Sequence, residues 1–151
     1  MSTQYMKLGF VDQVIKDDGF YNIKINGRTV GVNIDLGFNY YRGISLSCIE
    51  TFKVFIDGKE VPEDLMLFWL NGKGFRIGQL KDLYAEFWGI KQRAHVQIFN
   101  GGLSTGEHTI EVQMYLRCAY MQFAPGVYGM IDSSCKKALN LKEAVEYGER
   151  Y

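Results

Sequence analysis

The strongest constraint on the fold is a strict alternation of side-chain character over residues 110–120. One parity carries Ile110, Val112, Met114, Leu116, Cys118 and Tyr120, and the other carries Glu111, Gln113, Tyr115 and Arg117. Because successive side chains of a strand point to opposite faces, the pattern predicts a long, half-buried strand. The same period recurs over 30–36 and 94–98, where the polar residues expected on the outer face are Asn33, Asp35, His95 and Gln97.

Turn signals separate these runs. Asn26-Gly27, Asp57-Gly58 and Asn71-Gly72 are dipeptides that favour the positive φ of tight hairpin turns. The first joins 21–25 to 28–36, which predicts a hairpin. Short strands at this spacing indicate an all-β protein, an antiparallel β-sandwich or barrel, and we expect the sandwich.

One short helix is predicted over 77–88, where Leu80, Leu83, Tyr84 and Phe87 recur at helical spacing. A chain of 151 residues and 17.3 kDa is the size of one domain. We expect a single sandwich domain over 1–141. Residues 142–151 are expected to form a C-terminal tail, either a frayed helix or an extended arm.

The charge balance argues against two classes of partner. Lys and Arg number 17, as do Asp and Glu, so the chain has no net attraction for nucleic acid or an anionic membrane. The three cysteines form no CxxC motif, which suits reduced thiols in the cytoplasm. No apolar run is long enough for a signal peptide or a membrane span, so a cytoplasmic protein is expected.

Catalytic and metal-binding signals are weak. The only histidines are His95 and His108. If their strands form one hairpin around 100–107, the two rings lie about 13 Å apart. Metal–ligand bonds are about 2 Å long, so one ion could not bind both. No spacing typical of a nucleophile motif occurs either. We therefore expect no catalytic residue, no metal site and no cofactor in this chain.

Aromatic residues are abundant, with ten Tyr, ten Phe and two Trp. They gather with Arg and Met in NYYRG (39–43) and RCAYMQF (117–123), and these residue types are enriched at protein interfaces. The residues predicted to lie at an interface or near a substrate are Tyr40, Tyr41, Arg42, Arg117, Tyr120, Met121 and Phe123. The alternative is that they belong to a bulky sandwich core, with the arginine stems packed along apolar surface.

Three segments carry a family resemblance: YYRGISLSCIETFKVFIDGKEVP (40–62), GGLSTGEHTIEV (101–112) and LRCAYM (116–121). Their order and spacing, within about 10–141, resemble the small β subunit of bacterial C-glycoside deglycosidases. One departure is Cys118-Ala119, where the family pattern has a small hydroxyl residue before the tyrosine.

The resemblance implies a β-sandwich bound to a larger TIM-barrel α subunit that holds a divalent metal, expected to be manganese, and the catalytic base. The pair would cleave the sugar–aglycone C–C bond of 3-oxo-C-glycosides, such as flavonoid or isoflavonoid C-glucosides. A base would remove the proton beside the ketone, the metal would stabilise the enolate, and elimination would follow. This chain would be the accessory subunit of a carbon–carbon lyase. Residues 40–42 would contact the α subunit, and either the loop 101–108 or the segment 120–123 would shape the aglycone site.

A second interpretation is a stand-alone carbohydrate-binding module. Exposed aromatic rings on a β-sandwich can stack on sugar faces. Such a module would bind glycans as a monomer and would need no partner subunit.

Overall fold

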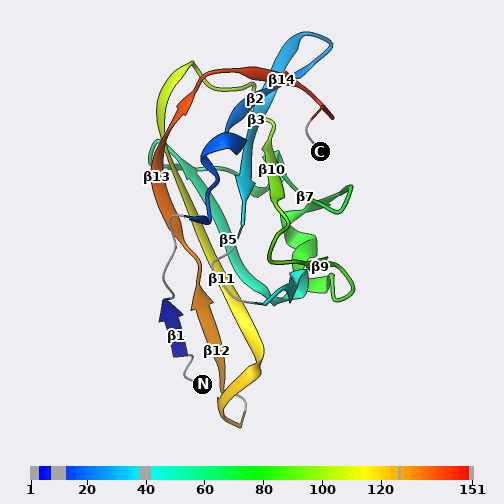
Figure 1. The fold of residues 1–151 in the computed structure, drawn as a ribbon, viewed down its shortest axis with the longest axis vertical. Helices are drawn as coiled ribbons and strands as arrows, with labels where there is room; N and C mark the ends of the chain where they lie inside the picture. Colours follow the sequence, from blue (N-terminus) through cyan, green and yellow to red (C-terminus); the bar gives the residue numbers. More distant parts are fainter. Residues whose placement is uncertain (1–3, 8–12, 38–41, 126, 150–151) are drawn as a thin grey trace.

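The structure, a computed structural model, describes residues 4–7, 13–37, 42–125 and 127–149. Within these ranges, 4–7, 118–124 and 127–128 are described by their backbone alone. These described residues form two six-stranded sheets and one two-stranded sheet (Figure 1). Most strand pairs are antiparallel, whereas β1 with β12 and β14 with β2 are parallel.

Sheet A surrounds the long strand predicted from residues 110–120. Its members are β1 (Gln4–Lys7), β12 (Val127–Asp132), β11 (Gly106–Ala124), β5 (Ile49–Ile56), β6 (Lys59–Glu60) and β13 (Cys135–Leu141). One edge of β11 pairs first with β13 and then with β12, and the other edge pairs with β5. The prediction of a long strand is confirmed, and the strand extends further at both ends.

Sheet B contains the predicted hairpin of 21–25 with 28–36. Its order is β14 (Ala144–Glu146), β2 (Tyr21–Ile25), β3 (Arg28–Leu36), β10 (Ala94–Ile98), β7 (Met66–Leu70) and β8 (Lys73–Arg76). Asn26 and Gly27 have φ of 51° and 78°, the conformation that a type I′ hairpin turn requires. The two other Xaa-Gly turns have the same pair of positive φ angles and join β5 to β6 and β7 to β8.

The two sheets pack face to face and bury one core. Sheet B contributes Val32, Ile34, Leu36, Phe68, Val96 and Ile98, and sheet A contributes Phe52, Val54, Ile110, Val112, Met114 and Leu116. The Phe52 ring of β5 meets the Phe68 ring of β7 edge-on, with centroids 5.5 Å apart. This aromatic contact joins the layers, and the predicted all-β sandwich is confirmed.

The connections between strands include four 3₁₀ segments: η2 (Asp17–Gly19), η3 (Leu46–Cys48), η4 (Glu63–Leu65) and η5 (Ile77–Asp82). The helix predicted over 77–88 is present only as η5. Residues Phe87–Trp88 instead form β9, which pairs with β4 (Ile44–Ser45). Ile77 and Leu80 are buried and Leu83 packs against the core. Their spacing of three matches the 3₁₀ period rather than the α-helical one.

The hairpin considered above, of 94–98 with the strand that contains His108, does not form. β10 pairs with β3 and β7 in sheet B, whereas β11 belongs to sheet A. The loop between them crosses from one layer to the other. His95 and His108 therefore lie in different sheets.

The outer face of sheet B is covered, although its polar residues were expected to face out. Asn33 and Gln97 are completely buried, and Asp35 is buried too. A Cβ added to Gly19 of η2 would lie 2.2 Å from the Cβ of Asp35, so this segment rests directly on the sheet. Tyr147 covers Gln97 and donates its hydroxyl to the Gln97 amide oxygen at 3.1 Å.

Of the two conformations considered for the tail, residues 144–146 adopt the extended one. β14 lies parallel to β2, with Val145 opposite Ile23. Val145, Ile23 and Tyr21 form a second, small apolar cluster. The division of the chain into a domain of residues 1–141 and a tail stays a prediction.

The β11–β12 hairpin continues past the rest of sheet A. β5 pairs with β11 only as far as Leu116, opposite Ile49. Beyond that point Cys118 faces Gly129, Gln122 faces Tyr128 and Ala124 faces Val127. We call residues 118–129 the arm, and Figure 1 shows the outer ends of β11 and β12 extending past the other labelled strands, at the bottom of the view.

Candidate functional site

The segment predicted to contact a partner enters the described structure at Arg42. Tyr40 and Tyr41 lie outside the described residues, and Arg42 is exposed. Gly43 packs against β9, because a Cβ at this position would lie 2.5 Å from two atoms of the Phe87 ring. Arg42 is therefore placed next to the small β4–β9 sheet.

Beside it, three large apolar side chains face solvent. Tyr84, Phe87 and Ile90 are 73%, 55% and 52% exposed, and we call them the β9 patch. Sequence reasoning missed this patch because a helical spacing would have turned Tyr84 and Phe87 toward the core with Leu80. The available signal was the three-residue spacing of Ile77, Leu80 and Leu83, which leaves Tyr84 and Phe87 off the buried stripe.

The backbone beneath the β9 patch is held by hydrogen bonds. The Ser45 hydroxyl lies 3.1 Å from the carbonyl oxygens of both Leu83 and Tyr84. The Trp88 indole N–H donates to the carbonyl of Gln92 at 2.9 Å. The completely buried Trp88 ring also packs edge-on against Phe68. The exposed rings thus project from an ordered support, which reduces the entropy lost when they contact another molecule.

Arg117 lies at the base of the arm, opposite Met130 of β12. Its guanidinium donates to the carboxylate of Glu50 at 2.6 Å, and the two side chains are 34% and 40% exposed. Such an ion pair adds little stability in water, because both groups remain solvated.

The remaining candidates, Tyr120, Met121 and Phe123, all lie in the outer part of β11. The hairpin register is irregular there, with shifts between Cys118 and Gln122 and between Gln122 and Ala124. Irregular pairing of this kind bends a ribbon and increases its twist. Of the predicted residues that the structure describes, Arg42 thus precedes β4, Arg117 lies at the base of the arm, and the other three belong to the arm.

A second region, at the opposite end of the sandwich, is fastened by His108. Its Nδ1 lies 2.7 Å from the Asp57 carboxylate, and its Nε2 lies 2.7 Å from the carbonyl oxygen of Ser104. Carboxylate and carbonyl oxygens are acceptors, so this arrangement favours the cationic imidazole, in which both ring nitrogens donate. The hydrogen bond with Asp57 raises the pKa of His108, the Ser104 carbonyl adds to this, and burial opposes it.

Asp57 is bound from two sides. Its second oxygen accepts the Thr109 amide at 2.9 Å. Its hydrogen bond with His108, followed by the one from Thr109, lowers the pKa of Asp57. The pair joins the β5–β6 turn to the loop before β11, so these groups fix that loop rather than point toward a substrate.

The same loop is also fastened to sheet B. The Asn22 side-chain amide donates to the Leu103 carbonyl at 2.9 Å and accepts the Leu103 N–H at 3.0 Å. Gly102 has φ of 91°, and a Cβ there would lie 2.4 Å from a methyl group of Thr29. The glycine therefore permits both the turn and the close approach, and the loop joins the two layers.

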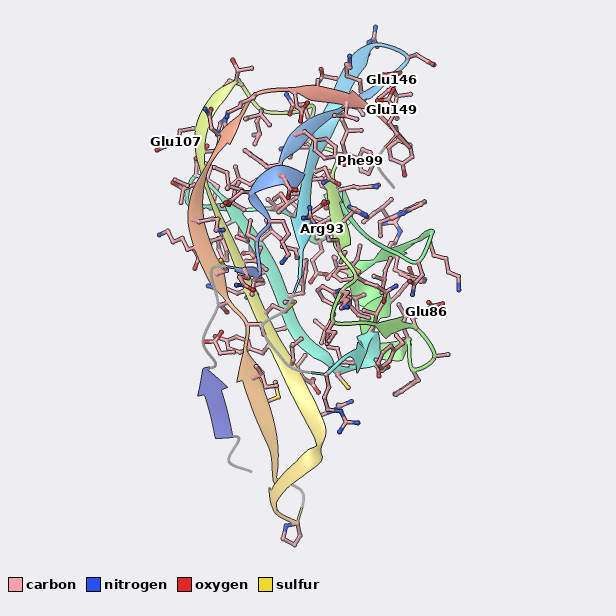
Figure 2. All side chains as sticks on the ribbon, in the orientation of Figure 1. Glu86, Arg93, Phe99, Glu107, Glu146 and Glu149 are labelled. Atoms are coloured by element: carbon pink, nitrogen blue, oxygen red, sulfur yellow. The ribbon has the colours of Figure 1, made fainter. Side chains whose placement is uncertain are left out.

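A polar network lies under η2 on the outer face of sheet B. Asp35 accepts from the Asn33 amide at 2.8 Å and lies 2.5 Å from Nδ1 of His95. Arg93, labelled in Figure 2, contacts Asp35 at 3.4 Å and Asp18 at 2.7 Å. The hydrogen bond from Arg93 lowers the pKa of Asp18. The buried carboxylate is thus compensated by its neighbours, as a structural ion network requires.

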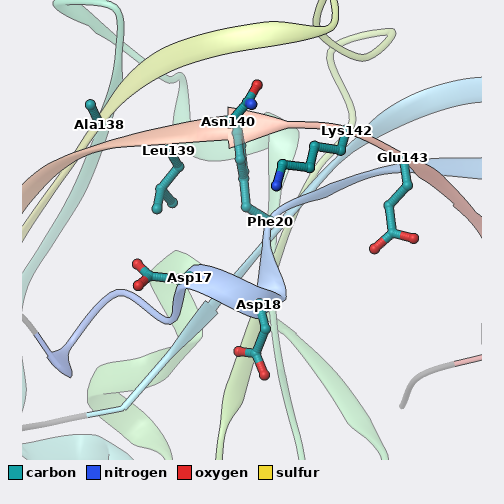
Figure 3. Close-up of a pocket in the computed structure, with 8 residues that line it drawn as sticks. All are labelled: Asp17, Asp18, Phe20, Ala138, Leu139, Asn140, Lys142 and Glu143. Carbon is teal, nitrogen blue, oxygen red and sulfur yellow. The ribbon is translucent and has the colours of Figure 1, made fainter.

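The hollow in Figure 3 lies between η2 and the end of β13 and has a volume of about 640 Å³. Its carboxylates already have partners within the chain. Lys137 Nζ contacts Asp17 at 3.0 Å, and Asp18 is bound by Arg93. None of the predicted interface residues lines this hollow.

Within the described ranges, no group of three or more His, Cys, Asp or Glu is arranged to hold a metal ion. Among those same residues, no helix has the length and apolar character needed to cross a membrane.

The fold and the surface define a β-sandwich protein with ordered, exposed aromatic residues at one end. Comparison with known proteins identifies its family. The chain belongs to the C-glycoside deglycosidase beta subunit family, whose model matches residues 10–120. The match includes the base of the arm and ends within β11.

Two curated relatives show the same similarity. The C-glycoside deglycosidase beta subunit of Eubacterium cellulosolvens is 30% identical over 111 residues, which cover 72% of this chain and 76% of the relative. The protein of the same name from Arthrobacter globiformis is 25% identical over 111 residues, covering 72% and 84%. The resemblance seen in the sequence motifs is confirmed.

Proposed function

We propose that this chain is the β subunit of a heteromeric C-glycoside deglycosidase, and that it works with a larger TIM-barrel α subunit. The observation that carries the proposal is the family match over residues 10–120. The subunit name of the relatives supports the presence of a second kind of chain. The assembly would be a carbon–carbon lyase, with this chain as its accessory subunit.

The substrate would be a 3-oxo-C-glycoside, such as an oxidised flavonoid or isoflavonoid C-glucoside. Its ketone acidifies the neighbouring C–H, so a base in the α subunit can remove that proton and elimination can break the bond from sugar to aglycone. A divalent metal in the α subunit, manganese being our expectation, would supply charge stabilisation for the enolate oxygen.

The role proposed for this chain is to stabilise the α subunit and to shape the aglycone site. His108 and Asn22 hold the loop 101–105 in one conformation. The β9 patch and Arg42 supply exposed aromatic and cationic groups for an interface. Cys48 is a free thiol, which suits the reducing cytoplasm in which we place the assembly.

The test is co-expression of this chain with the product of a neighbouring gene that encodes a TIM-barrel protein, if the genome carries one there. We expect the two chains to co-elute in size-exclusion chromatography. Aglycone should be released from a 3-oxo-C-glycoside by the complex and by neither chain alone. A TIM-barrel protein that releases aglycone equally fast without this chain would contradict the proposal.

A carbohydrate-binding module is the second candidate, because the rings of Tyr84 and Phe87 are exposed. It predicts that the isolated chain binds glucosides in calorimetry, and that Tyr84→Ala abolishes the signal. Binding of that kind, together with no co-elution, would favour the module over the subunit.

A further inference from the structure

We propose that the arm, residues 118–129, is the element through which this chain inserts into the larger subunit. The inference rests on the proposed function and adds which part of the surface makes the contact.

The first argument is geometric. Sheet A supports β11 on both edges only up to the pair of Leu116 with Ile49. Further out, the described pairing of β11 is with β12 alone, from Cys118 opposite Gly129 to Ala124 opposite Val127. Sheet B lies across from the body of sheet A, and Figure 1 shows the outer ends of β11 and β12 beyond sheet B. A two-stranded ribbon without a facing layer is marginally stable in water.

The second argument is chemical. Residues 118–131 form the longest stretch of the sequence without an ionisable acid or base of the Asp, Glu, Lys, Arg or His type. The arm includes Tyr120, Met121 and Phe123, types enriched at the centres of interfaces. Natural proteins usually place charges on strands that stay exposed, since uncharged ribbons aggregate. An uncharged projecting ribbon therefore fits a surface that is covered in the mature assembly.

The third argument concerns the occupant. Permanent subunit interfaces are more apolar than transient ones, and they need about 20–30 residues on each side. The arm alone is too short, but the β9 patch is joined to its base. The η3 segment directly precedes β5, and its Leu46 N–H donates to the Glu86 carbonyl at 2.9 Å, beside the patch. Contacts through η3 and β5 thus connect the β9 patch to the base of the arm at one end of the sandwich.

A second copy of this chain fits the arm less well. β1 already covers part of the outer edge of β12, from Gly129 to Asp132. The relatives are named beta subunits, which points to a chain of another kind as the permanent partner. We therefore infer that the arm binds in an apolar crevice of the larger subunit.

The test removes the arm without disturbing the sandwich. Cys118 and Gly129 lie directly opposite each other, so a two-residue Asn-Gly turn can replace residues 119–128. All four residues of β12 that pair with β1 are kept. The matched control is Ile25→Glu, which alters an exposed apolar residue at the β2–β3 turn, at the other end of the molecule.

We expect the shortened chain to keep the circular-dichroism spectrum of the full chain and to bind the co-expressed larger subunit at least about 100-fold more weakly, since two hot-spot residues alone account for that factor. The Ile25→Glu chain should bind as the unchanged chain does. If the shortened chain binds normally, the arm is not the docking element and only this inference falls. If the unchanged chain does not bind the larger subunit, the proposed function falls and the inference falls with it.

A second experiment keeps the full-length arm. Phe123→p-benzoylphenylalanine should crosslink to the larger subunit on illumination, whereas Ile25→p-benzoylphenylalanine should not. Crosslinking from position 123 to a second copy of this chain, or none to the larger subunit within a formed complex, would overturn the inference.

Discussion

The two ends of the sandwich differ in how their surface segments are held. One end carries the loop 101–105, and the other carries the arm. At the first end, His108 and Asn22 fasten the loop to both sheets. At the second, β11 and β12 continue past their neighbours, and the rings of the β9 patch face solvent. Hydrogen bonds between the layers therefore hold the loop at one end, and exposed apolar surface lies at the other.

The largest expected effect comes from comparing the same substitution, Phe to Ala, in the core and in the β9 patch. Phe68→Ala should lower the free energy of unfolding by about 3–5 kcal/mol, because it removes a completely buried ring from between Phe52 and Trp88. Phe87→Ala, at a ring that is 55% exposed, should cost less than about 1 kcal/mol. Urea unfolding of both variants measures the difference between their unfolding free energies. Equal losses in the two variants would contradict this distinction between core and patch.

The next effect tests the fastened end. His108→Leu removes both donors and leaves the Ser104 carbonyl without its partner. We expect a loss of about 1–3 kcal/mol in unfolding free energy. Hydrogen exchange of the Leu103 amide, which is bound by Asn22, should become faster as the loop loosens. Unchanged exchange would show that Asn22 alone holds the loop.

The same histidine predicts a pH dependence. The pKa of His108 is raised in the folded chain, so its stabilising contribution is complete below the unfolded value of about 6.5 and is lost as pH rises through the folded value. The pKa of Asp57 is lowered, so its contribution is present above about 3.9 and is lost as pH falls through the folded value. Melting temperature should therefore fall on the alkaline side for the unchanged chain, and this fall should be smaller for His108→Leu. Parallel curves for the two proteins between pH 5.5 and about 8.5 would contradict the assignment.

The smallest effect belongs to the arm end. Arg117→Ala breaks a solvated ion pair with Glu50 and should change unfolding free energy by less than about 1 kcal/mol. If Arg117 also contacts the larger subunit, the same variant should weaken the complex more than it weakens the fold. Comparing thermal unfolding with co-elution separates these two roles.

Local signals in the sequence were sufficient to predict the β2–β3 hairpin and the long strand β11. Asn26-Gly27 specifies its turn through backbone conformation, and the alternation at 110–120 identifies a face, so both predictions are confirmed. The alternation of apolar and polar residues could not show that the loop after β10 crosses from sheet B to sheet A. Two strands show the same alternation whether a hairpin or a crossover joins them. Nor could it show that η2 covers Asp35, which depends on a contact between residues far apart in the sequence.

The candidate site was predictable only in part. Residue types drew attention to Arg42, Arg117 and the outer part of β11, and their contribution to an interface stays a prediction. Tyr84 and Phe87 escaped notice because exposure depends on whether a segment is 3₁₀ or α-helical, and apolar content alone does not decide between these.

The parallel pairing of the first and last described strands has a consequence for how the chain folds. β1 must find β12, and β14 must find β2, so each sheet joins residues separated by more than a hundred positions. A topology of this high contact order folds slowly, since distant segments must meet before their contacts are formed. During synthesis sheet A cannot be completed until β13 has left the ribosome, and sheet B cannot be completed until β14 has. The uncharged arm emerges earlier, and a partner or a chaperone present at that moment would shield it from aggregation.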